Sequence, residues 1–231
     1  MIRQQAPVSP TAIRILFAAL VCLSGTACSM NPSEPTGFLK GDYAKLKKGS
    51  SGSLKRHVPP SGSLAKYSRG TIDPVIVQKH KDAEMEGIDQ SELAELKSYF
   101  NAQLREEFSK SYQVVSRGGS NVLRVRVAIT DARGTTPVLN IHWSTLLTRA
   151  GVGGCAMEAE FSDSRSGKQL AAFMDNRMGK ITGYFNGFSS VGHAKQVIRD
   201  WAKSLREALD EARGVTKPEP TKKKPTSARK R

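Results

Sequence analysis

Carboxylate and imidazole side chains that could perform acid–base chemistry are scattered along this 231-residue chain. Asp163 and Asp175 could act as a pair, with one as general acid and the other as general base. Each also has a plain structural interpretation, because Asp163 opens a turn and Asp175 ends a predicted strand. A hydrolytic site would have to gather two or more members of a dispersed set: Asp131, His142, Asp163, Asp175 and His193. An unrecognised hydrolase therefore stays open as an alternative.

Motifs of known enzymes and metal sites are largely absent from the sequence. It has no His-Glu-x-x-His, no Cys-x-x-Cys, no phosphate-binding loop and no Gly-x-Ser-x-Gly elbow. Ser63-Leu64-Ala65-Lys66 matches one motif of penicillin-binding enzymes, but their other two motifs are missing, which indicates chance. Metal-ligand spacing is lacking among the four histidines, His57, His80, His142 and His193. We predict no catalytic residue, no cofactor and no bound metal.

Residues 1–27 have the layout of an export signal. Arg3 and Arg14 accompany an apolar run over residues 15–23, and small residues over 24–27 lead to Cys28. A membrane-spanning helix needs about 20 apolar residues, so this run is too short to span a bilayer. It fits the apolar core of a cleaved signal peptide.

Small residues immediately before a cysteine resemble the lipobox of bacterial lipoproteins. In that class the signal is cut just before the cysteine, whose thiol and new amine receive acyl chains such as palmitate. The resemblance implies that Cys28 is lipidated and anchors the protein in a lipid bilayer. Ser29, in place of Asp, implies the inner leaflet of the outer membrane, with the domain facing the periplasm. The alternative is an ordinary signal cut near Ala27 that leaves Cys28 free.

Composition indicates one basic domain. The net charge is +15, and removing residues 1–27 leaves 204 residues with a net charge of +13. That length supports one domain with a real core and is short for two. If Cys28 is acylated, Cys155 has no disulfide partner, and we interpret it as a small buried hydrophobic residue.

Residues 215–231 are predicted to form a disordered basic tail. Seven basic residues over 217–231 are opposed only by Glu219, and three prolines interrupt the segment. After export, the polyanions such a tail could contact are anionic lipid, lipopolysaccharide and peptidoglycan, and we expect no nucleic acid. A solvated tail without a partner, or an exported polyanion-binding protein, are the alternatives.

Residues 28–66 are rich in Ser, Gly, Pro and Lys, which is typical of a flexible tether. Its cohesive elements are Gly37–Leu39 and Asp42-Tyr43, which could dock on the folded body. The domain itself is predicted to occupy residues 67–214.

Two helices are predicted within this domain. Asp89 and Glu92 form a capping-box pattern, and apolar residues then recur at three- and four-residue spacing: Leu93, Leu96, Phe100, Leu104 and Phe108. The second helix covers residues 191–213 and stops at Gly214. Its apolar stripe consists of Val197, Trp201, Leu205, Leu209 and Ala212.

The sequence predicts strands over 72–77, 112–115, 121–131, 156–162 and 169–175, and apolar and polar residues alternate in 121–131 and 156–162. The turn at 163–167 makes the last two a hairpin. Arg124 and Arg126 on one strand, and Glu158 and Glu160 on another, predict cross-strand ion pairs on a polar face. The expected fold is α+β: a single domain in which two amphipathic helices pack on one face of an antiparallel or mixed sheet.

Several segments together resemble a family of Gram-negative lipoproteins known only as domain of unknown function 3313. The resemblance covers residues 28–213 and implies a location and an architecture without an activity. The matching motifs are Gly37–Leu39, Asp42-Tyr43, Tyr67, Ile72–Val75, Leu123–Arg126, Ile129–Asp131, Glu158–Glu160, Asp163-Ser164 and Trp201-Ala202. We therefore expect a membrane-anchored envelope lipoprotein that binds a protein or cell-wall partner and is not an enzyme. A periplasmic hydrolase remains the alternative.

Overall fold

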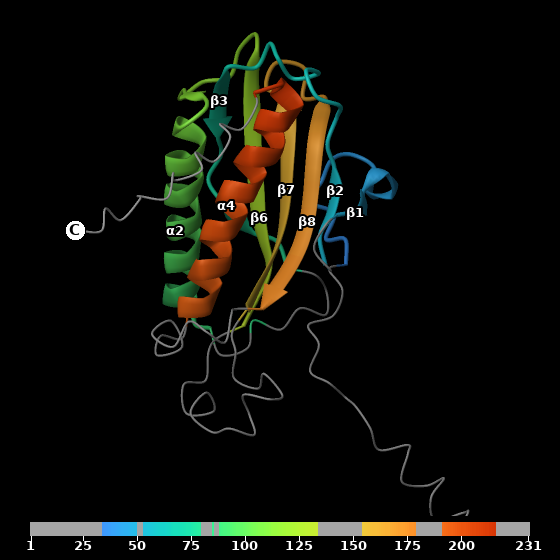
Figure 1. Ribbon diagram of the computed structural model, residues 1–231. Coiled ribbons are helices and arrows are strands. Elements are labelled where there is room, and N and C mark those ends of the chain that lie inside the picture. Colours follow the sequence, from blue (N-terminus) through green and yellow to red (C-terminus); the bar gives the residue numbers. More distant parts are fainter. Residues whose placement is uncertain are drawn as a thin grey trace, which may run out of the picture.

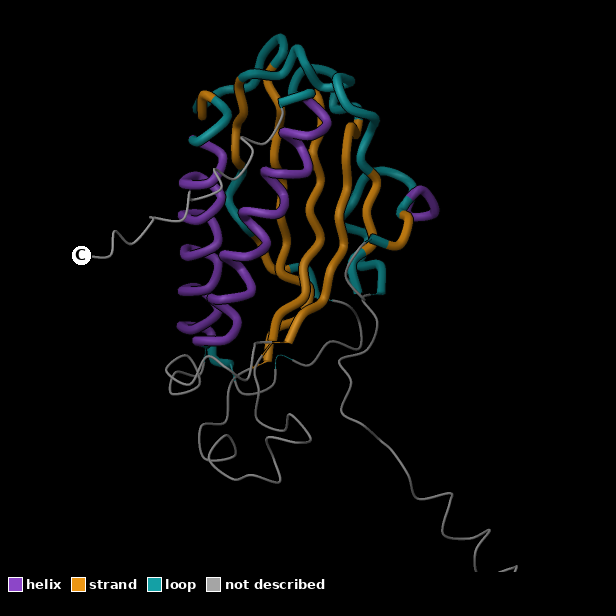
Figure 2. Tube along the Cα trace, in the orientation of Figure 1, coloured by secondary structure: helices purple, strands orange, loops and turns teal. Residues whose placement is uncertain are grey.

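An eight-stranded mixed sheet with two helices on one face forms the body of the protein (Figure 1). The computed structural model describes residues 34–49, 53–79, 85, 88–133, 154–178 and 191–215. Along the sheet the strands follow the order β1-β2-β8-β7-β6-β3-β5, and β4 also pairs with β6. Figure 2 shows the same arrangement, with α4 crossing in front of the strands and α2 to its left. The predicted single α+β domain is confirmed.

Three long antiparallel strands form the centre of the sheet: β6 (Val122–Arg133), β7 (Gly154–Asp163) and β8 (Gln169–Met178). The predicted alternation holds, since Leu123, Val125, Val127 and Ile129 are all buried against the helices. A tight turn joins β7 to β8, with Gly167 at a φ of 72° that favours glycine. The predicted hairpin is thereby confirmed.

Shorter strands flank this centre. The predicted strand over residues 72–77 is two strands, β3 (Arg69–Ile72) and β4 (Ile76–Val77), both parallel to β6. Pro74 lies between them, and its lack of an N–H group explains the interruption. β5 (Gln113–Val114) adds the far edge in parallel with β3.

α2 begins and α4 ends where the sequence predicts. α2 (Gln90–Ser109) begins with a complete capping box between Asp89 and Glu92. α4 (Gly192–Arg213) ends at Gly214, whose φ of 79° is the left-handed conformation that glycine adopts readily. α4 buries more residues than its predicted stripe, because it packs on α2 as well as on the sheet.

Aromatic rings fill the space between helices and sheet. The rings of Phe100 and Trp201 stack with centroids 6.1 Å apart, and those of Phe108 and Phe161 with centroids 6.0 Å apart. Phe173 meets the edge of Phe161 at 5.6 Å. Burying each such side chain stabilises the fold by about 1.5–3 kcal/mol. The core therefore joins α2, α4, β7 and β8 into one unit.

The fold includes much of the segment that we predicted to be a tether. Within residues 28–66, the structure places a 3-10 helix η2 (Tyr43–Lys45) and strands β1 (Lys47–Lys48) and β2 (Lys55–His57). β2 pairs with β8, and Leu64 donates a backbone hydrogen bond to Ala212. These residues are held by partners far away in sequence, which their polar composition does not show. The folded region thus extends back to at least residue 34.

Several predictions fall outside the described residues. These are the signal peptide, the lipidation of Cys28, the basic tail beyond Val215, and the positions of His80 and His142. No helix within the described ranges has the length and apolar character to cross a bilayer.

Candidate functional site

Asp163 and Asp175 do not form an acid–base pair. Asp163 ends β7, whereas Asp175 lies on β8 opposite Met157. Met157 and Asp163 are six residues apart on one strand, which separates them by about 20 Å at 3.3 Å per residue. Two carboxylates at that distance cannot serve one reacting bond. The pairing considered from the sequence is therefore absent.

Asp175 is a buried structural carboxylate. Its side chain is fully buried and accepts hydrogen bonds from Trp201 Nε1 at 2.9 Å, Ser53 Oγ at 2.8 Å and Arg177 Nε at 2.5 Å. Asn176 adds a backbone N–H at 3.0 Å. These donors occupy both oxygens of the carboxylate. Asp175 joins α4, β8 and the segment that precedes β2.

Asp163 is held by the turn that it opens. Its carboxylate accepts from the backbone N–H of Ser166 at 2.8 Å, the hydroxyl of Tyr67 at 2.7 Å and the backbone N–H of Arg165 at 3.1 Å. The N–H of Ser166, followed by the Tyr67 hydroxyl, lowers the pKa of Asp163 from 3.8 to about 2. Burial, and then the bond to Asp163, raises the pKa of Tyr67 to about 12.

The lowered pKa of Asp163 predicts an acid-sensitive contribution to stability. A folded-state pKa below the unfolded one stabilises the fold above pH 4, and this contribution is lost as the pH falls toward 2. We expect Asp163→Asn to lower the free energy of unfolding most above pH 4, and by less as the pH falls. Urea unfolding at several pH values measures this difference. A difference that stays constant from pH 5 to about pH 2 would contradict the assignment.

Cys155 and His193 are buried without forming a reactive site. Cys155 is free and fully buried, and burial raises the pKa of its thiol, as expected for the predicted small hydrophobic residue. His193 is 3% exposed, and its Nδ1 has no hydrogen-bond partner within the described ranges. Burial lowers the pKa of His193. Among the residues that the structure describes, no cluster of His, Cys, Asp and Glu could hold a metal ion.

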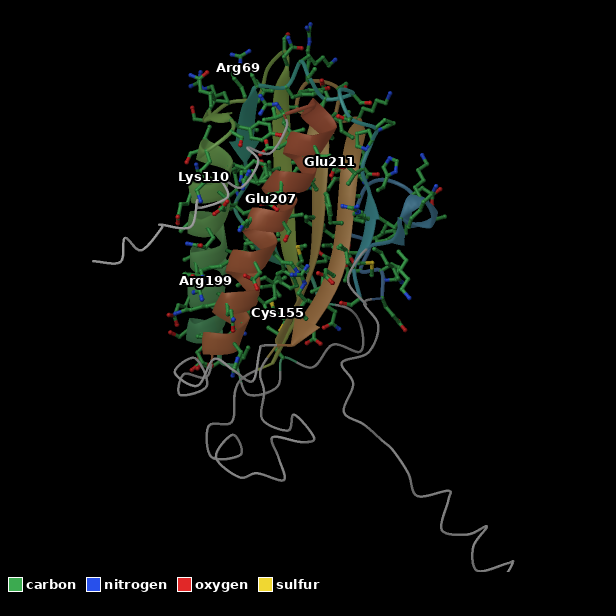
Figure 3. The ribbon with its side chains drawn as sticks, viewed as in Figure 1. Arg69, Lys110, Cys155, Arg199, Glu207 and Glu211 are labelled. Carbon is green, nitrogen blue, oxygen red and sulfur yellow. The ribbon has the colours of Figure 1, made fainter. Side chains whose placement is uncertain are left out.

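A groove runs between α4 and the strands β8 and β2. It encloses about 860 Å³ and is lined by both apolar and charged side chains. Apolar lining comes from Leu54, Met157, Phe173, Trp201 and Leu205. Figure 3 shows Glu207 and Glu211, which also line the groove, along α4. Asp131, Asp163, Asp175 and His193 are not among its lining residues, so the groove does not assemble the acid–base set considered above.

Two buried glutamates hold the N-terminal segment, which we define as residues 36–46, on the opposite face of the sheet. Glu158 is fully buried and accepts the backbone N–H of Thr36 at 2.8 Å and the hydroxyl of Tyr43 at 2.6 Å. Glu160 is 1% exposed and accepts the backbone N–H of Lys40 at 2.9 Å. Together they bind main-chain groups of a segment about 120 residues earlier in the chain.

The predicted pairing of arginines with these glutamates is half confirmed. Arg126 forms an ion pair with Glu160, and its guanidinium lies 4.5 Å from the ring centroid of Phe38. Arg124 pairs instead with Asp73 at 2.7 Å. Burial, and then the hydrogen bond to Glu158, raises the pKa of Tyr43 to about 12. The Glu-x-Glu pattern on a central strand was the available signal, but the sequence did not show that a segment covers it.

Three solved structures resemble the chain at low identity. A dodecameric PelC variant from Paraburkholderia phytofirmans is 15% identical over 66% of this chain and 95% of that chain, with a TM-score of 0.40. A hypothetical protein from Chlamydia trachomatis is 12% identical over 61% and 96%, with a TM-score of 0.38. A Xanthomonas campestris protein of family DUF330 is 8% identical over 68% and 92%, with a TM-score of 0.35.

No curated protein matches the chain. The family model described as "Protein of unknown function (DUF3313)" matches residues 34–205. That range includes the N-terminal segment, its two glutamates, the central strands and most of α4. It is also the family indicated by the sequence motifs. The chain belongs to the DUF3313 family.

Proposed function

We propose that the protein is a cell-envelope lipoprotein, anchored by acylated Cys28 in the inner leaflet of the outer membrane. Its domain faces the periplasm and has a binding or assembly role without catalysis. The observation that carries the proposal is the apolar signal core followed by small residues and Cys28. Acyl chains contribute about 0.8 kcal/mol per buried CH₂, and two or more chains anchor a protein stably.

Because the N-terminal segment is bound to the domain, the anchor limits the distance between the domain and the bilayer. Glu34, the first described residue, lies six positions after Cys28 in the chain. Even fully extended, six residues span about 20 Å. Because Thr36 and Lys40 are bound to Glu158 and Glu160, the domain would stay close to the bilayer. The anchored protein would thus act at the membrane surface.

Two features support a binding role over hydrolysis. The groove beside α4 combines apolar and charged lining in the way that binding surfaces do. Asp163 and Asp175 lie far apart, and each is bonded to structural partners. An envelope protein or a cell-wall component remains the proposed kind of partner. The basic tail could add contacts to anionic lipid, lipopolysaccharide or peptidoglycan.

Metabolic labelling with a palmitate analogue tests the anchor. We expect the wild type to incorporate the label and Cys28→Ser to lose it. Cys22→Ser is the matched control, because it lies in the signal core and should keep the label. An unlabelled wild type, or label retained in Cys28→Ser, would overturn the proposal. Separation of the two membranes on a density gradient then checks the outer-membrane assignment, which recovery in the inner membrane would contradict.

A further inference from the structure

The β1–β2 hairpin carries an unusual concentration of positive charge. Lys47 pairs in register with Arg56, and Lys48 pairs with Lys55. Like charges directly opposite each other on neighbouring strands destabilise the pairing. The hairpin therefore holds two repulsive pairs, which a bound anion would relieve.

Acidic residues within the described ranges form no salt bridge with these four cations. Asp42 is the only acidic residue between Lys40 and Arg56, and its carboxylate caps η2 by accepting the N–H of Ala44 at 2.8 Å. Some other cations of the fold are paired, as in Arg124–Asp73 and Lys195–Glu95.

The register places part of this charge on the side of the N-terminal segment. Lys55 lies opposite Met174, which lies opposite Glu158, so Lys55 and Lys48 share the sheet face that holds the N-terminal segment. Lys40 and Lys45, on that segment, are exposed as well. We call these four exposed lysines, Lys40, Lys45, Lys48 and Lys55, the basic patch. Figure 1 shows β1 and β2 at the edge of the sheet, beside the blue N-terminal part of the chain.

Protection of the sheet edge explains only some of the positively charged residues on β1 and β2. Lysines on an edge strand discourage pairing with other chains, which accounts for Lys47 and Lys48 on β1. β2 is not an edge strand, because it pairs with both β1 and β8. Arg56 lies on the other face, where it lines the groove together with acidic residues of α4. Lys55 therefore needs another reason, and a negatively charged surface supplies one.

We propose that the basic patch binds the anionic head groups of the bilayer in which the protein is anchored. The inference rests on the proposed function, because that places the start of the described fold within about 20 Å of the membrane. Lysine near an anionic surface contributes about 1 kcal/mol, an attraction that salt screens over about 10 Å. The anchor and the basic patch together would determine which face of the domain lies toward the bilayer.

Vesicle binding of the unacylated mature chain tests the patch. The protein is residues 28–231 with Cys28→Ser, and the vesicles are phosphatidylcholine alone or mixed with phosphatidylglycerol. We expect binding to the anionic vesicles only, lost at high salt. Lys45→Gln, Lys48→Gln and Lys55→Gln together should weaken it on the order of 100-fold, from about 1 kcal/mol per lysine. Removing the repulsion between Lys48 and Lys55 should leave Tm unchanged or raised.

Two further triple variants separate the patch from net charge and from the tail. Lys66→Gln, Lys97→Gln and Lys203→Gln remove equal charge elsewhere on the fold and should reduce binding much less. Lys222→Gln, Lys223→Gln and Lys224→Gln report on the tail. The proposal would be overturned if the patch triple and the control triple lost binding equally, or if only the tail triple lost binding. Absent binding of the wild type at low salt would overturn it as well. None of these outcomes depends on acylation, which palmitate labelling decides separately.

Discussion

Replacing Trp201 with alanine is expected to lower the free energy of unfolding by about 3–5 kcal/mol, as is typical of a large buried aromatic residue. Trp201 is 1% exposed, and its ring stacks on Phe100 of α2. Its indole N–H donates to the fully buried carboxylate of Asp175 at 2.9 Å. The substitution therefore opens a cavity and also removes a donor from a buried charge. Urea unfolding followed by far-ultraviolet circular dichroism measures the loss.

One variant separates the lost hydrogen bond from the cavity, and a second serves as the control. Trp201→Phe keeps an aromatic ring but removes the N–H group, and a hydrogen bond to a charged group is worth about 1.5–3 kcal/mol. Lys203→Ala, two residues along the same helix and exposed, should change stability by less than about 0.5 kcal/mol. If Trp201→Ala costs no more than Lys203→Ala, Trp201 does not join α4 to the core as described.

Replacing Glu160 with alanine is expected to release the N-terminal segment and to cost about 3–5 kcal/mol, as when one partner of a buried ion pair is removed. Arg126, whose side chain is 19% exposed, would lose its carboxylate partner. The backbone N–H of Lys40 and the amide of Gln169 would lose their acceptor as well. Hydrogen exchange should show faster exchange at the Lys40 amide, and trypsin should cleave at Lys40 and Lys45 sooner.

Glu106→Ala is the matched control for this substitution. Glu106 is exposed on α2, and its carboxylate accepts a hydrogen bond from the side-chain amide of Gln103 at 3.2 Å. It should change neither the urea midpoint nor the exchange at Lys40. If Glu160→Ala leaves the Lys40 amide as protected as in the wild type, the buried glutamate does not hold this segment.

Local signals made the helices and central strands predictable. Asp89 and Glu92 start α2 through contacts within one turn, and β6 follows a strict alternation because only one of its faces packs on the helices. Gly214 stops α4 through its own backbone conformation. In each case the determining residues are close together in sequence, so the pattern is visible there.

The N-terminal part of the fold depends on partners far away in sequence. Strands of two or three residues, such as β1 and β2, are too short to show a periodicity. Thr36 and Lys40 are held by Glu158 and Glu160, which the sequence suggested would form ion pairs on a polar face. The groove likewise forms only when α4 lies beside β8 and β2. Neither the binding of the N-terminal segment to the sheet nor the groove could be derived from one segment of the sequence alone.

Intact-mass spectrometry of the mature protein purified from membranes tests the anchor most directly. We expect a chain that begins at Cys28 and exceeds the mass of residues 28–231 by that of its acyl chains. Cys28→Ser should lack this added mass. A mature chain that begins at another residue, or that carries an unmodified Cys28, would contradict the lipoprotein assignment.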